Sequence, residues 1–505
     1  MKTPVRNLSK SKLLTFRQCP KRLWLEVHRP ELREDSAASQ AAFKVGYQVG
    51  DIARQVYDPK DIGVLIDAQT DGFDAAFART QELLKSAQPI FEAGFRAEGG
   101  LAFADVMLPI KRGAKLSWRM VEVKSSTSVK DYHRDDVAIQ AFLARASGVA
   151  LDSIALAHID SAWTYAGKGD YGGLLVESDL TDDALSREEE VRGWISSAQN
   201  LVVKKKPPQV STGKHCTQPF ECGFLPHCQS AEPQAAQPIG WLPGRLSNKL
   251  SAHIEANSLI ELRDAPDNML NEKQQRVKGV MLSGKAWFDK VGAANSLAAY
   301  KLPAYFLDFE TIQFAVPIWK GTRPYQQIPF QFSMHSLSRT GKLEHKAFLD
   351  LSGTDPSNAF AKALVAACGG RGPIFVYNAG FETARIRELV GRFPILSKQL
   401  LSLNERVVDL LQVARDHYYH PSQQGSWSIK AVLPALFPEL DYNYLGGVQD
   451  GGMAMDIFFE ALAPETTATR KAEIKGQLLA YCALDTYAMV RLWSAFTGNA
   501  VPANA

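Results

Sequence analysis

Acidic side chains interrupt two parts of the sequence that are otherwise as apolar as buried β-strands. The first part carries Asp105 and Glu122, and the second is the segment AYFLDFETI, which holds Asp308 and Glu310. Burying a carboxylate costs free energy unless the group is hydrogen-bonded, paired with a cation or bound to a metal. Any fold of this chain must therefore bring a neutralising partner to each of these acids.

The length and composition predict a globular protein with more than one domain. The chain has 505 residues, of which 46% are hydrophobic and 22% are charged, and chains of this length usually divide into domains. Strand-like and helix-like segments alternate in both halves, so we expect α/β architecture throughout. The expected organisation is a first domain at 1–230, a linker and helical connector at 231–300 with its helices at 246–300, and a second domain at 301–497.

The sequence contains no sign of a membrane segment or an export signal. No stretch approaches the roughly 18 uninterrupted apolar residues of a membrane-spanning helix, and the first residues lack the apolar core of a signal peptide. We therefore expect a cytoplasmic protein with no membrane partner. The net charge of +3 is mildly basic, but basic residues cluster at 10–22 and at 204–214. Such clusters are either solvated surface or contacts with phosphates.

The segment GLAFADVMLPIKRGAKLSWRMVEVKSS predicts a β-hairpin with a polar turn at 111–115, and the segment after it predicts a helix. Glu122 and Lys124 are two apart and share one face of the returning strand, while Asp105 lies in its partner. A bare salt bridge between Glu122 and Lys124 is one interpretation. The other is a hydrolytic site, in which two carboxylates bind a divalent cation and the ammonium group orients water.

This arrangement resembles the PD-(D/E)XK nuclease superfamily in its RecB-like branch, which has a restriction-endonuclease-like fold. The resemblance implies that Asp105, Glu122 and Lys124 are catalytic and that the two acids bind the metal. Members carry a glutamine on the next helix, matched here by Gln140, although the aromatic residue that usually follows four positions later is absent. The family also places a histidine or an acid on an upstream helix, where this chain offers Asp51.

A cluster of cysteines follows this predicted nuclease core. The segment HCTQPFECGFLPHC holds Cys216, Cys222 and Cys228, spaced more evenly than the close pairs of most zinc ribbons. In a reducing compartment a disulfide framework is not expected. Zinc, with His215 or His227 as additional ligands, is one interpretation of the cluster, and three buried free thiols are another.

One early cysteine, Cys19, stands before the same core. An early cysteine followed by a later triplet resembles the iron-sulfur nucleases of the RecB-like branch, similar to the CRISPR-adaptation exonucleases and the AddB-type nucleases. The resemblance implies that the four thiolates bind a [4Fe-4S] cluster, which would tie the two ends of the module together. Cys368 and Cys482 lie in apolar helical segments, and we expect both to be core residues.

A second set of acids occupies the C-terminal part. Asp308 and Glu310 share one face of a strand, and two like charges this close favour a cation between them. Glu382 follows Asn378, which ends a strand, by one helical turn. In the last predicted helix Tyr481 and Asp485 are four apart and therefore share a face. We expect the neighbouring Cys482 to point away from that face.

This order of motifs resembles the DnaQ-like exonucleases of the DEDD group, tyrosine subclass, which have an RNase H-like fold. The resemblance implies two Mg²⁺ or Mn²⁺ ions and a tyrosine, Tyr481, that positions the attacking water. The family normally has an aspartate where this chain has Glu382, and Asp409 either substitutes for it or caps a helix. The implied metal ligands are Asp308, Glu310, Glu382 and Asp485. The pairing of both modules resembles a bacterial fusion family without an assigned role.

The two sets of motifs together predict a metal-dependent nuclease that acts on DNA, exonucleolytically on single strands or ends. One alternative is a catalytically impaired protein that binds nucleic acid or recruits a partner, and the departures from the family patterns favour it. Another is an RNA 3'-5' exonuclease, because the DEDD group acts on both polymers. Nothing in the sequence identifies a protein partner.

Overall fold

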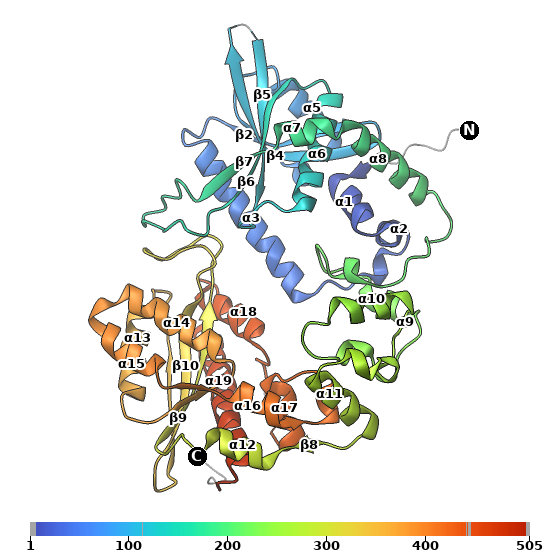
Figure 1. Ribbon diagram of the computed structural model, residues 1–505. Coiled ribbons are helices and arrows are strands. Elements are labelled where there is room, and N and C mark those ends of the chain that lie inside the picture. Colours follow the sequence, from blue (N-terminus) through green and yellow to red (C-terminus); the bar gives the residue numbers. More distant parts are fainter. Residues whose placement is uncertain (1–6, 114, 441, 443–445, 501–505) are drawn as a thin grey trace. The chain divides into compact units, whose positions relative to one another are not determined.

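The computed structural model in Figure 1 describes residues 7–113, 115–440, 442 and 446–500. The chain divides into two compact units. Unit 1 comprises Met1–Pro233 and Phe314–Tyr325, and unit 2 comprises Gln234–Gln313 and Gln326–Ala505. Each unit combines helices with a mixed β-sheet, which confirms the expected α/β class. Within the described ranges, no helix has both the length and the apolar character that crossing a bilayer would require.

Unit 1 is built on a seven-stranded sheet in the order β2-β3-β4-β5-β6-β7, with β1 beside β4. The pairs β3–β4, β4–β5 and β6–β7 are antiparallel. The pairs β2–β3, β5–β6 and β1–β4 are parallel. The expected hairpin is confirmed as β4 and β5. The strands are β1 Leu8–Ser9, β2 Val64–Leu65, β3 Ile90–Ala97, β4 Gly100–Arg112, β5 Lys115–Lys124, β6 Leu151–Ile159 and β7 Leu175–Asp179.

The helix expected after the hairpin is confirmed as α6, which is the most enclosed helix of unit 1. All its residues from 136 to 144 are buried, because α6 contacts the sheet as well as α1, α7 and α8. The α-helices of unit 1 are α1 Lys10–Gln18, α2 Pro20–His28, α3 Ala37–Tyr57, α4 Ala68–Asp71, α5 Phe73–Leu83, α6 Asp131–Ala146, α7 Thr181–Ser186, α8 Glu188–Val202 and α9 Leu225–Ser230.

Unit 2 contains a five-stranded sheet in the order β11-β10-β9-β12-β13. Strand β9 pairs antiparallel with β10 on one side and parallel with β12 on the other, so the strand that holds Asp308 and Glu310 is central. The strands are β9 Ala304–Ile312, β10 Ile328–Leu337, β11 Leu343–Leu349, β12 Ile374–Val376 and β13 Val407–Asp409. A small separate ladder joins β8, Trp287–Phe288, to β14, Tyr418–Tyr419.

Helices flank this sheet, and the long C-terminal helix that the sequence predicts is confirmed as α19. In Figure 1 α19 runs alongside β9 and β10, with which it is in contact. The α-helices of unit 2 are α10 Asn248–Ala256, α11 Glu272–Ser283, α12 Lys290–Leu297, α13 Ser357–Cys368, α14 Ala379–Arg392, α15 Ser397–Asn404, α16 Leu410–His417, α17 Ile429–Leu436, α18 Gly451–Leu462 and α19 Ala468–Thr497.

The helices at 246–300, expected as a connector, belong to unit 2. Leu250, Leu262 and Val277 are fully buried and share one hydrophobic cluster with Phe375 of β12 and Trp493 of α19. Because these apolar side chains share one cluster with residues of the sheet and of α19, the segment is part of the core of unit 2.

Residues 314–325 connect β9 to β10 but belong to unit 1, whereas the sequence boundaries placed them in the second domain. The segment packs there because Ala315 joins a small apolar cluster with Val49 and Leu174. The hydroxyl of Tyr325 donates to the carbonyl oxygen of Ser125, the residue directly after β5. No local period in the sequence distinguishes this segment from its neighbours.

Candidate functional site

Strand β9 places Asp308 and Glu310 on the face that α19 covers. Alternation along the strand directs Leu307 and Phe309 into the cluster formed with α13 and α14, whereas Phe306, on the opposite face, packs in the cluster that contains Trp493 of α19. Glu310 is 7% exposed. Asp308 is half-buried, so the two carboxylates lie at the edge of a hydrophobic core and not inside it.

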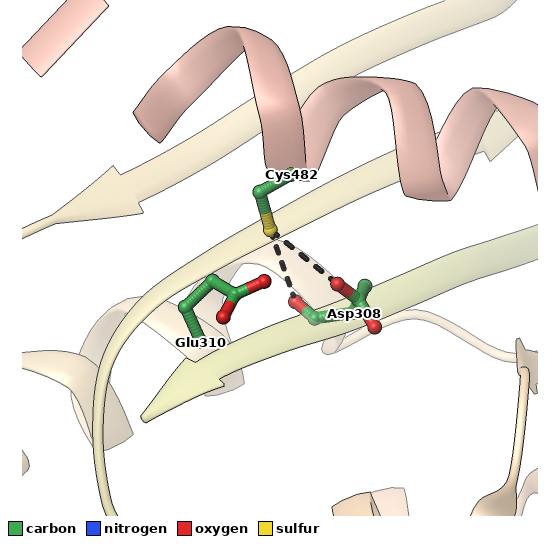
Figure 2. A group of neighbouring side chains, drawn as sticks. All are labelled: Asp308, Glu310 and Cys482. Atoms are coloured by element: carbon green, nitrogen blue, oxygen red, sulfur yellow. Dashed lines mark hydrogen bonds between the residues drawn. The ribbon is translucent and has the colours of Figure 1, made fainter. Parts of the chain in front are cut away.

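Helix α19 presents Tyr481, Cys482 and Asp485 to this face, and all three are buried. Figure 2 shows the Cys482 thiol directed at Asp308, with its sulfur 3.7 Å from Oδ2 and 3.8 Å from the carbonyl oxygen. The expectation that Cys482 points away is wrong. Consecutive helical residues are separated by only about 100° around the axis, so residue 482 still shares the broad face of 481 and 485.

Glu382 approaches the same site from the first turn of α14. Its side chain is 2% exposed, and its Oε2 accepts no hydrogen bond from the described residues. The charge of Glu382 is one of those that raise the pKa of Asp308, which puts the two carboxylates in one electrostatic environment. The acids that the sequence predicted from three separate motifs are therefore gathered by β9, α14 and α19.

Asp409 serves as a helix cap. Its carboxylate accepts the backbone N–H groups of Asn378 at 3.0 Å, Ala379 at 3.1 Å and Leu411 at 2.9 Å. These contacts cap α16 and hold the start of α14, where Asn378 has a left-handed backbone with φ of 83°. Asp409 could either replace Glu382 as a metal ligand or cap a helix, and its contacts are those of a helix cap. The same contacts hold the first turn of α14, which carries Glu382.

The carboxylates of unit 2 resist ionisation because they are desolvated and close together. Burial, and then the charges of Asp485, Glu310 and Glu382, raise the pKa of Asp308. Burial followed by Asp485 raises the pKa of Glu310 to about 8, and burial followed by Asp409 raises the pKa of Glu382 to about 8. Burial also raises the pKa of Asp485, to about 6. A divalent cation would favour the charged form of all four acids.

Two further residues reach this site that the sequence did not predict. The hydroxyl of Tyr442 donates to Oδ1 of Asp485 at 2.6 Å. The ammonium group of Lys430 lies 5.4 Å from the ring centroid of Tyr442 and 5.1 Å from that of Tyr481, and its charge lowers the pKa of Glu310. Neither residue stands at a recognisable spacing from the acids, because both arrive through tertiary packing.

The predicted residues of unit 1 also converge. Glu122 is 1% exposed and accepts hydrogen bonds from Lys124, from Lys10 at 2.9 Å and from Gln140 at 2.6 Å. Asp105 accepts the backbone N–H of Val123 at 2.7 Å. Burial, and then the charge of Glu122, raises the pKa of Asp105 well above its usual range.

Asp136 and Lys10 complete this group, and the sequence did not assign either residue to the site. Asp136 of α6 is 3% exposed and contacts Lys124 at 2.6 Å, Lys10 at 3.0 Å and Gln140 at 2.9 Å. Although burial opposes ionisation of Asp136, Lys10 and Lys124 lower its pKa. The spacing of Asp136 and Gln140, four apart on a predicted helix, is the signal that could have identified Asp136.

Asp51, a candidate metal ligand from the sequence, forms an ion pair with Arg54 at 2.5 Å, and its side chain is 59% exposed. The pair lies on one surface of α3, three residues apart. No contact in the described residues brings Asp51 into the group around Glu122.

Four cysteines line one pocket of unit 1: Cys19, Cys216, Cys222 and Cys228. Burial raises the pKa of Cys19, and the neighbouring thiols of Cys216 and Cys228 add to the shift. His215 also lines the pocket, together with Lys21 and Arg22. A set of four thiols is the donor set expected of an iron-sulfur or zinc site. Cys368, by contrast, is a core residue of the cluster around β12, as expected.

Helix α1 connects this pocket to the acidic group. Lys10 begins the helix and contacts Glu122, whereas Cys19 follows its last residue, Gln18. The Gln18 side chain donates to the carbonyl oxygens of His215 and Phe220, at 2.7 Å each. The N-terminal helix is thus held at one end by the cysteine-rich loop and at the other by the acids.

A protein family described as a domain of unknown function (DUF2779) matches residues 305–428. The matched range includes Asp308, Glu310 and Glu382 and ends before Lys430 and α19. A comparison with curated proteins finds no match.

We expect the stability of unit 2 to fall as pH rises when no divalent cation is added. The pKa values of Glu310 and Glu382 are about 8, above the ordinary 4.5, so the folded chain binds more protons than the unfolded chain between these values. Their contribution is complete below about pH 4.5 and is lost as pH rises through about 8. Melting temperatures measured across this range should fall less steeply for Glu310→Gln, whereas the exposed-site control Glu473→Gln should match the wild type. An equal fall of melting temperature with pH in Glu310→Gln and in the wild type would contradict the raised pKa of Glu310.

We expect Lys10→Ala to destabilise unit 1 by about 2 kcal/mol, because Glu122 and Asp136 lose a charged hydrogen-bond donor in a buried position. Lys12→Ala, two residues along the same helix, should change stability by less than about 0.5 kcal/mol. Urea unfolding of both variants measures the difference. Equal stability of the two variants would show that Lys10 does not hold these acids.

Proposed function

We propose that the chain is a metal-dependent nuclease that hydrolyses phosphodiester bonds of DNA, exonucleolytically on single strands or ends. The observation that carries the proposal is the gathering of Asp308, Glu310, Glu382 and Asp485 in unit 2. Their pKa values are raised by burial and, for Asp308, by the other three acids. Lys430 is the positive group that lowers the pKa of Glu310. Mutually repelling carboxylates at one edge of a core are the ligand set that hard divalent cations require.

In this proposal the four acids would hold two Mg²⁺ or Mn²⁺ ions. When bound, such ions supply the positive charge that activates water and stabilises the developing charge on the phosphate. The hydroxyl of Tyr481 orients the attacking water, and Tyr442 holds Asp485 in place through its 2.6 Å hydrogen bond. Lys430 adds positive charge beside the acids, where it attracts a phosphate group. The longer side chain of Glu382 suits its place on the first turn of α14, near enough to affect Asp308.

We propose that unit 1 is a PD-(D/E)XK domain with a second nuclease site and that unit 2 has an RNase H-like, DnaQ-like fold. The mixed sheets, the β4–β5 hairpin and the position of α6 after it support the first assignment. The central strand β9 beneath the long helix α19 supports the second. A cytoplasmic location is part of the same proposal.

A second candidate function is binding of nucleic acid without turnover in unit 1. Lys10 and Lys124 already neutralise Glu122 and Asp136, so a metal ion would have to displace an ammonium group in order to bind. This alternative predicts salt-sensitive DNA binding by unit 1 and no cleavage there. A third candidate, an RNA 3'-5' exonuclease, is distinguished by competition between matched RNA and DNA oligonucleotides.

We expect the purified chain to degrade labelled single-stranded DNA with Mg²⁺ or Mn²⁺. Asp308→Asn should reduce the rate of unit 2 by about 100-fold or more, because it removes a metal ligand. Lys124→Ala should abolish any contribution of unit 1, so the combined variant should be inactive. The exposed-site controls Glu473→Gln and Asp74→Asn should keep full activity. Wild-type rates in the combined variant would refute the proposal.

For the cysteine pocket we propose a [4Fe-4S] cluster, with zinc as the alternative. Protein purified without oxygen should be brown, with a broad visible absorption band, and Cys19→Ser should lose the colour and destabilise unit 1. Cys368→Ser, a buried cysteine outside the pocket, is the matched control and should keep the colour. Colourless protein with one equivalent of zinc that is lost in Cys19→Ser and kept in Cys482→Ser would show that the pocket binds zinc.

A further inference from the structure

A thiol stands among the acids of unit 2. The ligand atoms of Asp308, Glu310 and Cys482 all lie within 4.8 Å of one another, and Figure 2 shows the three side chains converging. Cys482 is 0% exposed. The sulfur lies 3.7 Å from Oδ2 of Asp308, and no disulfide involves it.

This separation matches that of two ligands on one small cation. With zinc–sulfur bonds of about 2.3 Å and zinc–oxygen bonds of about 2.1 Å, a tetrahedral angle puts sulfur and oxygen about 3.6 Å apart. The observed 3.7 Å needs almost no rearrangement.

A second observation also points to a cation. Glu382 is 2% exposed, and its Oε2 lacks a hydrogen-bond donor among the described residues. Its charge acts on Asp308. A buried carboxylate oxygen without a donor is costly unless a positive group approaches it.

The chemistry of sulfur determines which cation fits. Mg²⁺ prefers oxygen ligands and octahedral geometry, whereas thiolates select softer ions such as Zn²⁺. We propose that Asp308, Glu310 and Cys482 form a binding site for a thiophilic divalent cation of the Zn²⁺ class. The inference rests on the same acidic site as the proposed function and deepens it, because this ion competes with Mg²⁺ for two shared carboxylates.

Competition makes the thiophilic ion an inhibitor. A cation held by Cys482 occupies Asp308 and Glu310 in a geometry with one sulfur ligand, which differs from the oxygen-only arrangement that Mg²⁺ requires. On binding, the thiol proton passes to solvent and a metal–sulfur bond forms, so there is no change of oxidation state.

The test is a binding titration of the full chain with Zn²⁺ and with Co²⁺, in the absence of nucleic acid. Co²⁺ reports thiolate ligation through its charge-transfer absorption. Cys482→Ser should lower the Zn²⁺ affinity of this site by about tenfold or more and remove its part of the cobalt band, while the Mg²⁺ affinity stays within about twofold. Cys368→Ser, with the same number of thiols, should behave as the wild type. The four-cysteine pocket contributes equally to all these proteins.

A second variant keeps the test decisive if Cys482→Ser does not fold. Asp308→Asn keeps Cys482 but removes a shared ligand, so it should also lose this part of the cobalt band. Identical cobalt spectra and Zn²⁺ affinities in wild type and Cys482→Ser, or a full band in Asp308→Asn, would overturn the inference.

The result is separable from the nuclease proposal. Cys482-dependent Zn²⁺ binding without any hydrolysis in Mg²⁺ would support the metal site and refute the proposed function. Hydrolysis in Mg²⁺ without Cys482-dependent Zn²⁺ binding would do the reverse.

Discussion

The cost of burying carboxylates governs both units, and each unit meets it differently. In unit 1, Glu122 and Asp136 are paired with Lys10 and Lys124, so the charges are balanced within the protein. In unit 2, burial raises the pKa of Asp308 and of three other acids, and neighbouring charges add to the shift for Asp308 and Glu310. In the first arrangement Glu122 and Asp136 are neutralised without an ion, although burial keeps the pKa of the neighbouring Asp105 raised. The second is complete only with protons or metal, which is why the nuclease proposal rests mainly on unit 2.

The sequence predicted those site residues whose relation is local. A spacing of two on a strand identified the β9 pair, Asp308 and Glu310, and a spacing of four on a helix identified the α19 pair, Tyr481 and Asp485. The sequence did not predict Lys430 and Tyr442, which reach the site from distant elements, because neither has a regular sequence spacing from the motif residues. The orientation of Cys482 was also predicted wrongly, because the face of α19 that carries Tyr481 and Asp485 is broad enough to include it.

The same distinction holds for the fold. The β4–β5 hairpin and the helices α6 and α19 follow from local alternation, turn residues and helical periodicity, and these predictions were confirmed. Which core a segment joins depends on contacts that sequence periodicity does not encode. The apolar residues at 246–300 complete the core of unit 2, and the short segment at 314–325 packs on unit 1, although neither has a distinctive pattern.

Helix α1 makes the thiol pocket and the acids of unit 1 mechanically dependent on each other. The helix is only nine residues long, or about 13 Å, and is rigid over that length. A shift of Cys19 would move the whole helix. Lys10, at the opposite end, would then lose its contacts with Glu122 and Asp136, and the two acids would lack that counter-ion. Oxidation of the thiols would then weaken the charge balance of Glu122 and Asp136 at the opposite end of the helix.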